Sequence, residues 1–484
     1  MLSCEQPRLT RMSFLACDSW QVVLRIRTLE SVFSRKELRT LLRRSAEMVS
    51  VISKRVQMAP MRYSQAYLLG TFFLFLTSNL AEKVENIFML TVFVLLAYSL
   101  LYAGYKVGIL TKKNKLLLPH ALSANQTKRV RVIVLVGSIY FLVWGVNQLI
   151  DFGATSPIDV FSNITNPGSA YSSKFSVYEE RLATNTVNRV TQILILLSLV
   201  YAIYIPMLVF YWKKLGLVLR VFSLVSVAIY VISFLFIGTQ KGLGDVILFA
   251  VSGFAILLAS GSIVVDRALK RKIYALTVVL LCLAFTYMAI NQASRFKEFG
   301  LLDSLMFGDV SNTWISQVLG KNLALGVYSI LGYPSHGYLG LSYNLDQDFV
   351  FSYGAGFSQA FESYRYQFFG GSQNFFLTYP ARTEVITGWP AGMYWSTAFP
   401  WFASDITFFG CLLLMFVVGF FFSRTWLRCI GRHDPVSFAS LGQFFIFIAF
   451  LPANNQVLMQ RQGLWTVVTI VFIRFFQKLI KGSV

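Results

Sequence analysis

The chain is dominated by long apolar runs that contain almost no charged residue. Ten such runs occur, near residues 64–81, 86–109, 132–150, 190–211, 217–237, 245–265, 273–290, 405–423, 436–453 and 463–477. A helix of about 20 apolar residues crosses the roughly 30 Å of hydrocarbon in a bilayer. Because lipid offers no hydrogen-bond partners, a single spanning segment must be a helix, in which the backbone groups bond to one another. The pattern therefore predicts an all-α polytopic membrane protein with about ten transmembrane helices.

The composition argues against a single soluble domain, and the apolar runs divide the chain into four parts. Of the 484 residues 13% are charged and 56% are apolar, whereas a soluble protein carries about 25% charged residues. We expect a cytoplasmic basic extension over residues 1–63 and a first group of seven spans over 64–290. A large periplasmic loop should follow over 291–404, and three spans with a short cytoplasmic tail over 405–484.

The basic residues are distributed unevenly between the two sides of the predicted membrane. When the spans alternate in direction, one side holds 32 of the 43 Lys and Arg residues and the other side holds 11. Cytoplasmic loops carry such an excess, so we expect both termini in the cytoplasm and the loop 291–404 outside it. The same distribution accounts for the net charge of +21, because the basic residues orient the chain in the membrane and contact anionic lipid. It therefore argues against a nucleic-acid partner.

Two outer segments are longer than a connection between spans requires, namely 151–189 and 291–404. The second is rich in Tyr, Phe, Trp and Gly, which favours a folded lid over a disordered linker. Aromatic rings stack on the faces of sugars, but they also anchor proteins at the level of the lipid headgroups. Tyr338, Trp389 and Trp395 are therefore candidate substrate-binding residues, with the interfacial role as the alternative.

The few cations on the outer side are candidates for binding phosphate, because a guanidinium group binds phosphate through two parallel hydrogen bonds. These cations include Lys241, Arg295, Lys297, Lys321, Arg365, Arg382 and Arg461. Arg295 and Lys297 directly follow the seventh span, where the phosphates of a lipid would lie. A pair that simply reaches for headgroup phosphates remains the alternative.

Lys241 lies in a glycine-rich turn between two spans, from Gly238 to Gly244. Glycines let backbone N–H groups approach an anion, and a cation on this side runs against the charge trend. Both observations favour a substrate-binding role for Lys241. A tight connection between two spans is the simpler alternative.

Candidates for acid–base chemistry are equally few. His336 is the single outer histidine among three, and an unperturbed imidazole titrates near neutral pH, as a general base should. A structural role in an aromatic loop is the alternative. Asp405 opens the eighth predicted span and is either a catalytic carboxylate or the N-terminal cap of that helix. The chain contains neither a phosphate-binding loop nor a zinc-ligand motif, so we expect no metal and no cofactor.

Over residues 64–478 the chain resembles the Wzy-type polymerases of O-antigen and related repeat-unit polysaccharides, which belong to the GT-C-like group of membrane glycosyltransferases. The resemblance rests on the layout of spans around one large late loop and on three local patterns. These are the turn Gly238 to Gly244, the stretch Trp395 to Gly410 entering a span, and Leu451-Pro452-Ala453-Asn454-Asn455. Many members have Arg in the turn where this chain has Lys241.

The resemblance implies a function in the bacterial inner membrane, with the active site facing the periplasm. A growing glycan would be transferred from undecaprenyl pyrophosphate to a lipid-linked repeat unit, and a chain-length regulator protein would be a further partner. Catalytic roles would fall to His336, Arg295, Arg382 and Asp405, and substrate binding to Lys241, Lys297, Arg365, Tyr338, Trp389 and Trp395. An O-antigen ligase is the nearest alternative, and a flippase of lipid-linked oligosaccharide is the third.

Overall fold

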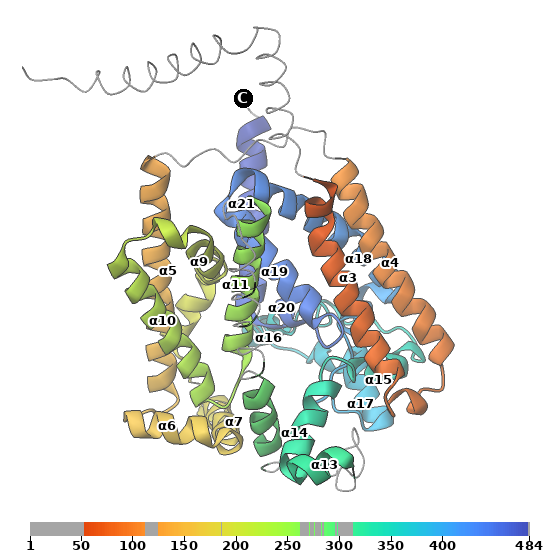
Figure 1. Ribbon diagram of the computed structural model, residues 1–484. Helices are drawn as coiled ribbons and strands as arrows, with labels where there is room; N and C mark the ends of the chain where they lie inside the picture. The colour runs from red at the N-terminus through yellow and green to blue at the C-terminus, as the bar shows by residue number, and fades with distance from the viewer. Residues whose placement is uncertain are drawn as a thin grey trace, which may run out of the picture. The chain divides into compact units, whose positions relative to one another are not determined.

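The computed structural model describes residues 53–111, 124–184, 186–261, 271, 275, 282, 285–295, 298 and 313–482. The account below concerns the compact unit to which the described residues from Arg55 onward belong. Its described part contains helices and connecting turns and no β-strand (Figure 1).

The helices confirm a membrane protein. Among the described residues, six helices are long and apolar enough to cross a bilayer, and a bent pair, Arg189–Leu196 with Ser198–Lys214, would make a seventh span with a bend of 61°. The bent pair contains α8 (Arg189–Leu196) and α9 (Ser198–Tyr211). The six are α4 (Ile87–Leu110), α5 (Ala124–Asp151), α10 (Leu217–Phe236), α11 (Lys241–Ala259), α18 (Phe399–Arg432) and α21 (Arg461–Gly482).

Three of the ten predicted spans lack this support. Helix α3 (Lys54–Leu76) has a first half that contains Arg62 and several other polar residues, and it is not apolar enough to count among the six. Helix α19 (Pro435–Phe450) is apolar but has only 16 residues, which is shorter than a span of about 20 residues. The predicted span 273–290 lies mostly outside the described residues.

Small residues let the helices pack closely. Gly104 and Gly108 are spaced four apart on α4 and face α18, where a Cβ on Gly104 would lie 1.9 Å from the carbonyl oxygen of Phe416. From the other side, a Cβ on Gly419 of α18 would lie 2.0 Å from the carbonyl oxygen of Leu101. Membrane helices associate through such small-residue contacts because burial against lipid gives them no hydrophobic driving force.

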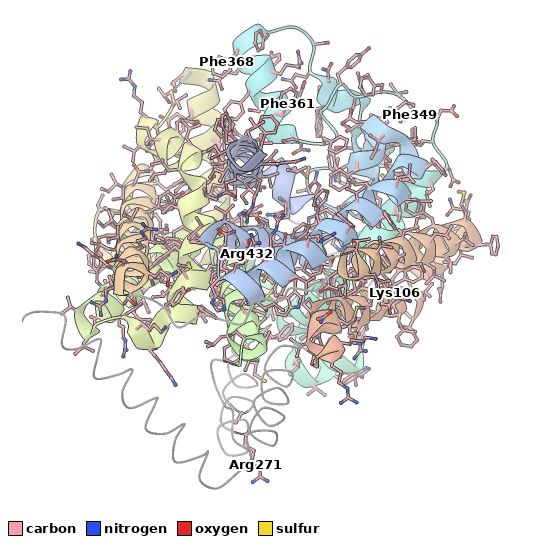
Figure 2. The ribbon with its side chains drawn as sticks, turned by 90° about the horizontal axis from the view of Figure 1, so that it is seen from above. Lys106, Arg271, Phe349, Phe361, Phe368 and Arg432 are labelled. Atoms are coloured by element: carbon pink, nitrogen blue, oxygen red, sulfur yellow. The ribbon has the colours of Figure 1, made fainter. Side chains whose placement is uncertain are left out.

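The large predicted loop is folded in its described part. It contains α13 (Trp314–Leu319), α14 (Lys321–Gly332), α15 (Gly337–Leu345), α16 (Gln359–Phe369), the short 3₁₀ helix η4 (Asn374–Leu377) and α17 (Tyr379–Thr387). Helices α13, α14 and α17 lie at the same end of the bundle as α6 (Pro157–Thr165) and α7 (Pro167–Thr184) (Figure 1). Figure 2 looks down on the opposite end, where α4 and α18 carry Lys106 and Arg432 near their C-termini.

Candidate functional site

A cavity of about 1940 Å³ opens among the helix ends on the side of α6 and α7. Its walls come from the ends of α5 and α10, the starts of α8, α11 and α21, helices α7 and α16, and the helical stretch 285–295. Two of the wall residues, Phe361 and Phe368 of α16, are labelled in Figure 2. The lining cations are Lys174, Arg181, Lys241, Arg295 and Arg461, and Asp151 is the one lining carboxylate among the described residues.

Two glycines allow α7 to enter the wall of this cavity. The backbone N–H of Gly168 donates a hydrogen bond of 3.0 Å to the hydroxyl of Ser294, and a Cβ on Gly168 would lie 2.5 Å from the Ser294 carbonyl oxygen. Gly238 has φ +65°, and a Cβ there would lie 2.5 Å from the carbonyl oxygen of Pro167. A larger residue at either position would push α7 away. The glycine-rich turn is thus a packing surface for α7.

Arg295 and Lys174 form a cationic pair over aromatic rings. The guanidinium carbon of Arg295 lies 3.4 Å from the ring centre of Tyr171, a cation–π arrangement. The ammonium of Lys174, one turn further along α7, lies 5.1 Å from the same ring. Burial, together with the charge of Arg295, lowers the pKa of Lys174 to about 8. An anion bound here would relieve the repulsion between the two cations.

Of the other three cations that line the cavity, two form an ion pair with a carboxylate of the described residues and one does not. Lys241 Nζ lies 2.5 Å from Oδ2 of the buried Asp245, and Arg181 Nη2 lies 2.8 Å from Oδ1 of Asp151. Arg461 instead donates a hydrogen bond of 2.7 Å to the hydroxyl of Ser363. Within the described part of the chain, no carboxylate pairs with Lys174, Arg295 or Arg461. These three form the uncompensated positive surface of the cavity.

Aromatic and amide side chains complete the walls. The rings of Tyr333 and Trp395 lie 4.0 Å apart, centre to centre, and both line the cavity. Aromatic faces and carboxamides are the groups that stack on sugar rings and hydrogen-bond to their hydroxyls. The lining amides include Asn147, Gln148, Asn188, Gln292, Gln456 and Gln460. Arg295, Lys241 and Trp395 are thus the predicted site residues that the cavity brings together.

His336 lies outside the cavity lining and is 1% exposed. Its Nδ1 lies 3.0 Å from the carbonyl oxygen of Gly332, and its Nε2 accepts a hydrogen bond of 3.0 Å from the backbone N–H of Trp395. Burial lowers the pKa of His336 to about 4. The expectation that it titrates near neutral pH is therefore wrong. A neutral imidazole with both nitrogens bound to backbone supports the structural alternative.

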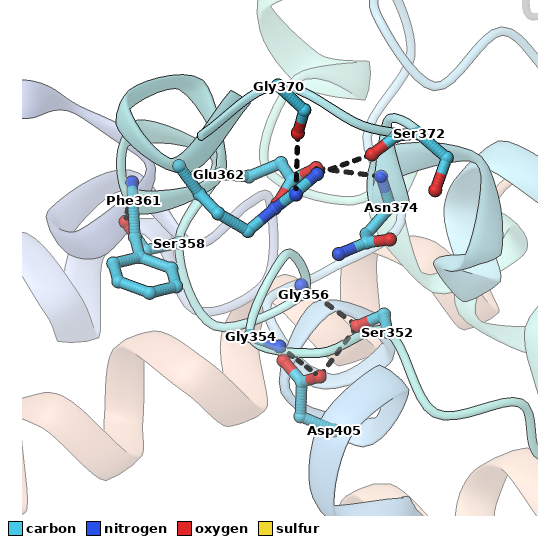
Figure 3. Close-up of polar contacts among 11 residues, drawn as sticks. Ser352, Gly354, Gly356, Ser358, Phe361, Glu362, Gly370, Ser372, Asn374 and Asp405 are labelled. Atoms are coloured by element: carbon cyan, nitrogen blue, oxygen red, sulfur yellow. Dashed lines mark hydrogen bonds and ion pairs between the residues drawn. The ribbon is translucent and has the colours of Figure 1, made fainter. Parts of the chain in front are cut away.

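Arg365 forms an ion pair with Glu362, which is labelled in Figure 3, and it does not line the cavity. Its Nε and Nη2 donate to the two carboxylate oxygens of Glu362, at 2.7 Å each. The same guanidinium donates to the carbonyl oxygens of Gly370 and Ser372, and Glu362 accepts from the Asn374 backbone N–H at 2.7 Å. Burial raises the pKa of Glu362, but the hydrogen bonds from Arg365 and from the Asn374 N–H, together with the charge of Arg365, outweigh burial and lower the pKa. Arg365 thus braces the turn after α16, and its predicted role in substrate binding gains no support from these contacts.

Asp405 holds a loop in place (Figure 3). Its Oδ1 accepts hydrogen bonds from the Ser352 hydroxyl at 2.7 Å and the Gly354 N–H at 2.8 Å, and its Oδ2 accepts from the Phe357 N–H at 2.8 Å. Helix α18 begins at Phe399, seven residues earlier than a cap at Asp405 requires, and the non-helical residue inside it is Thr407. The predicted capping role is therefore wrong, and the carboxylate faces the loop 352–357 rather than the cavity.

Arg382 also donates its hydrogen bonds to backbone. Its Nη2 lies 2.8 Å from the carbonyl oxygen of Asp348, and its Nε lies 3.2 Å from that of Leu377. The side chain does not line the cavity. These contacts join α17 to the two segments that precede it, so the predicted catalytic role gains no support from the geometry.

Tyr338 and Trp389 are packing residues. The Tyr338 hydroxyl lies 2.6 Å from that of Tyr98 and 2.9 Å from that of Thr71, which ties α15 to α3 and α4. The indole of Trp389 donates to the Trp395 carbonyl oxygen at 3.2 Å. Neither side chain lines the cavity, so the substrate-binding roles predicted for them gain no support from the geometry. Lys297, the remaining predicted site residue, lies outside the described residues.

The sequence did not single out Lys174, Tyr171 or Arg181, and it noted Arg461 only as an outer cation. A signal was available in the long outer segment 151–189, because its cations Lys174 and Arg181 oppose the charge trend as Lys241 does. That segment supplies α7, one wall of the cavity.

Comparison with known proteins adds no relative. No known protein family, curated protein or solved structure matches this chain. The function proposed below therefore rests on the geometry of the cavity and on the sequence resemblance.

Proposed function

We propose that this protein is a GT-C-like membrane glycosyltransferase of the Wzy type. It polymerises undecaprenyl-pyrophosphate-linked repeat units of O-antigen or a related surface polysaccharide. The observation that carries the proposal is the cavity at the helix ends. There Lys174, Arg295 and Arg461 lie among aromatic and amide side chains, and no carboxylate of the described residues pairs with them. A phosphate group and a saccharide are the ligand chemistry that such walls complement.

In the proposed reaction the cations act on the leaving group. A hydroxyl of the incoming repeat unit forms a bond to the anomeric carbon of the growing glycan, while the bond from that carbon to the pyrophosphate oxygen breaks. Negative charge develops on the departing pyrophosphate, and Arg295 and Lys174 stabilise it at a position that is already organised. The stabilising groups are thus supplied by α7 and the stretch 285–295.

The acceptor hydroxyl must lose a proton in this reaction. His336 has both ring nitrogens bound to backbone. Among the described residues Asp151 is the carboxylate of the cavity wall, with a side chain 15% exposed and held by Arg181 at 2.8 Å. We assign it the role of general base, because an oriented carboxylate at the substrate can accept the proton as the new bond forms.

The proposal places the protein in the bacterial inner membrane with about ten spans, both termini in the cytoplasm and the cavity facing the periplasm. The excess of Lys and Arg on the opposite side of the predicted spans supports this orientation. Lipid-linked repeat units that have been flipped to the outer leaflet would then meet the cavity at the level of their phosphates.

The test is polymerisation by the purified full chain in proteoliposomes that contain an undecaprenyl-pyrophosphate-linked repeat unit. We expect a ladder of lipid-linked glycans and release of undecaprenyl pyrophosphate. A second reaction that also contains lipid A core distinguishes the polymerase from a ligase. A ligase would transfer single units to the core, and it would produce no ladder in the reaction that lacks the core. A preparation that binds the substrate but neither extends nor transfers it would contradict the proposal.

A further inference from the structure

Helix α6 is fixed by two local motifs immediately after α5. Gly153, with φ +83°, ends α5, and the backbone N–H groups of Gly153 and Ala154 donate to the carbonyl oxygens of Ile150 and Leu149 at 3.1 and 2.9 Å. This is the hydrogen-bond pattern of a Schellman motif.

A capping box then starts α6. The Ser156 hydroxyl accepts from the Asp159 N–H at 3.2 Å, and the Asp159 carboxylate accepts from the Ser156 N–H at 2.8 Å, with Pro157 in the first turn. Such a reciprocal pair fixes where a helix begins and how the chain enters it. The direction of α6 relative to α5 is thus determined by a few residues.

Helix α6 runs across the helices that span the membrane rather than along them (Figure 1). It packs against α10 and α7 with one side, on which Val160 and Ile164 are partly buried. On its other side Ile158 is 78% exposed and Phe161 is 70% exposed. Two large apolar side chains one turn apart are thus left uncovered at the level where α5 and α10 end.

These side chains continue the exposed apolar stripe of α5. Val136, Ile139, Val143, Val146 and Ile150 recur at helical spacing along α5, and each is at least 40% exposed. An exposed apolar stripe on a membrane span faces lipid. Ile150 is in the last turn of α5 and is 69% exposed. Ile158 and Phe161 follow directly after the turn at Gly153, so the lipid-facing surface extends onto α6.

We propose that α6 is an interfacial anchor that lies in the headgroup layer of the bilayer, with Ile158 and Phe161 inserted among the upper acyl chains. Its ligand is the phospholipid surface itself, which binds amphipathic helices that lie in its plane. Because α6 leads directly into α7, the anchor also sets the depth of Lys174 and Arg295 at the level of lipid phosphates. The inference is independent of the enzymatic function proposed above.

The test is photo-crosslinking of the full chain in phospholipid nanodiscs, with p-benzoylphenylalanine in place of Phe161. The control carries the same residue in place of Glu179, an exposed carboxylate on α7. Mass spectrometry of the irradiated protein should show at least about tenfold more phospholipid adduct at position 161 than at position 179, because a benzophenone reacts with the acyl C–H groups it touches. Replacement of Ile158 repeats the test if the first variant does not fold.

Two results would overturn the anchor. An absence of lipid adducts at position 161, or adducts no more abundant there than at position 179, would show that α6 is not inserted in the acyl chains. A crosslink from position 161 to a second protein chain, without lipid adduct, would show that a protein covers this face.

Discussion

The guanidinium carbon of Arg295 lies 3.4 Å from the centre of the Tyr171 ring, a contact that joins the stretch 285–295 to α7 across more than 120 residues of sequence. The ring fixes the plane of the guanidinium without neutralising it. Arg295 is therefore oriented, uncompensated by a carboxylate in the described part of the chain, and on the cavity wall. The predictions below follow from this contact and its surroundings.

The Tyr171 ring should matter more than its hydroxyl. Tyr171→Leu removes the cation–π contact, which contributes about 0.5 to 2 kcal/mol, and we expect chain extension to fall about tenfold. Tyr171→Phe keeps the ring and should stay within about twofold of the native rate. Rates in proteoliposomes, normalised to inserted protein, measure both. Equal losses in the two variants would contradict the orienting role of the ring.

Lys174 should make pyrophosphate binding depend on pH. Burial and Arg295 lower its pKa to about 8, and the anion binds the protonated ammonium. Affinity should therefore be full below pH 8 and decline as pH rises through about 8. Titration calorimetry with inorganic pyrophosphate at pH 6.5 and 9 measures the change. Lys174→Arg, which stays charged, should remove most of the decline, and the same decline in that variant would assign it to another group.

The pair of Lys241 and Asp245 should respond asymmetrically to mutation. The Asp245 side chain is 4% exposed and that of Lys241 is 25% exposed, so loss of the lysine leaves the less hydrated charge behind. Lys241→Met should lower stability by about 2 to 3 kcal/mol, and Asp245→Asn by about 1 kcal/mol. Thermal unfolding in detergent compares the two, and the reverse order would contradict this account of the pair.

His336 should act on stability rather than on chemistry. His336→Ala loses a buried ring and two hydrogen bonds to backbone, which should cost about 2 to 4 kcal/mol. The activity of the protein that remains folded should stay within about threefold of the native value. Loss of a general base would instead reduce the rate by about 100-fold or more. Specific activity per folded protein separates the two roles.

The membrane character of the fold could be predicted from the sequence because a span needs only local information. The runs at 86–109 and 217–237 match α4 and α10 to within one residue at each end, and the run at 405–423 lies inside α18; all three helices are long enough to cross a bilayer. The sequence pattern does not determine how long a helix becomes or where packing bends it. The run at 436–453 became the 16-residue α19, and the run at 190–211 bends by 61° between α8 and α9.

The site was predicted less well, because a charged side chain on the outer side can bind a ligand or brace a loop. Arg295 and Arg365 are both arginines on the predicted outer side. Glu362, however, lies one helical turn before Arg365 and accepts hydrogen bonds from it through both carboxylate oxygens. The partners of Asp405 lie about 50 residues earlier in the chain. Such partners depend on tertiary structure, which residue type and spacing do not determine. The charge of Lys174 on the outer side was a signal in the sequence, but its position beside Arg295 depends on tertiary structure.

The most direct measurement is the banding of extracted polysaccharide from cells that produce Arg295→Ala, normalised to the amount of inserted protein. We predict a single repeat unit on the lipopolysaccharide core and no longer bands, with protein as abundant as the native chain. Arg295→Lys should restore extension only in part, because an ammonium keeps the charge but loses the planar fork. A full ladder from Arg295→Ala would remove Arg295 from the site and contradict the proposed function of the cavity.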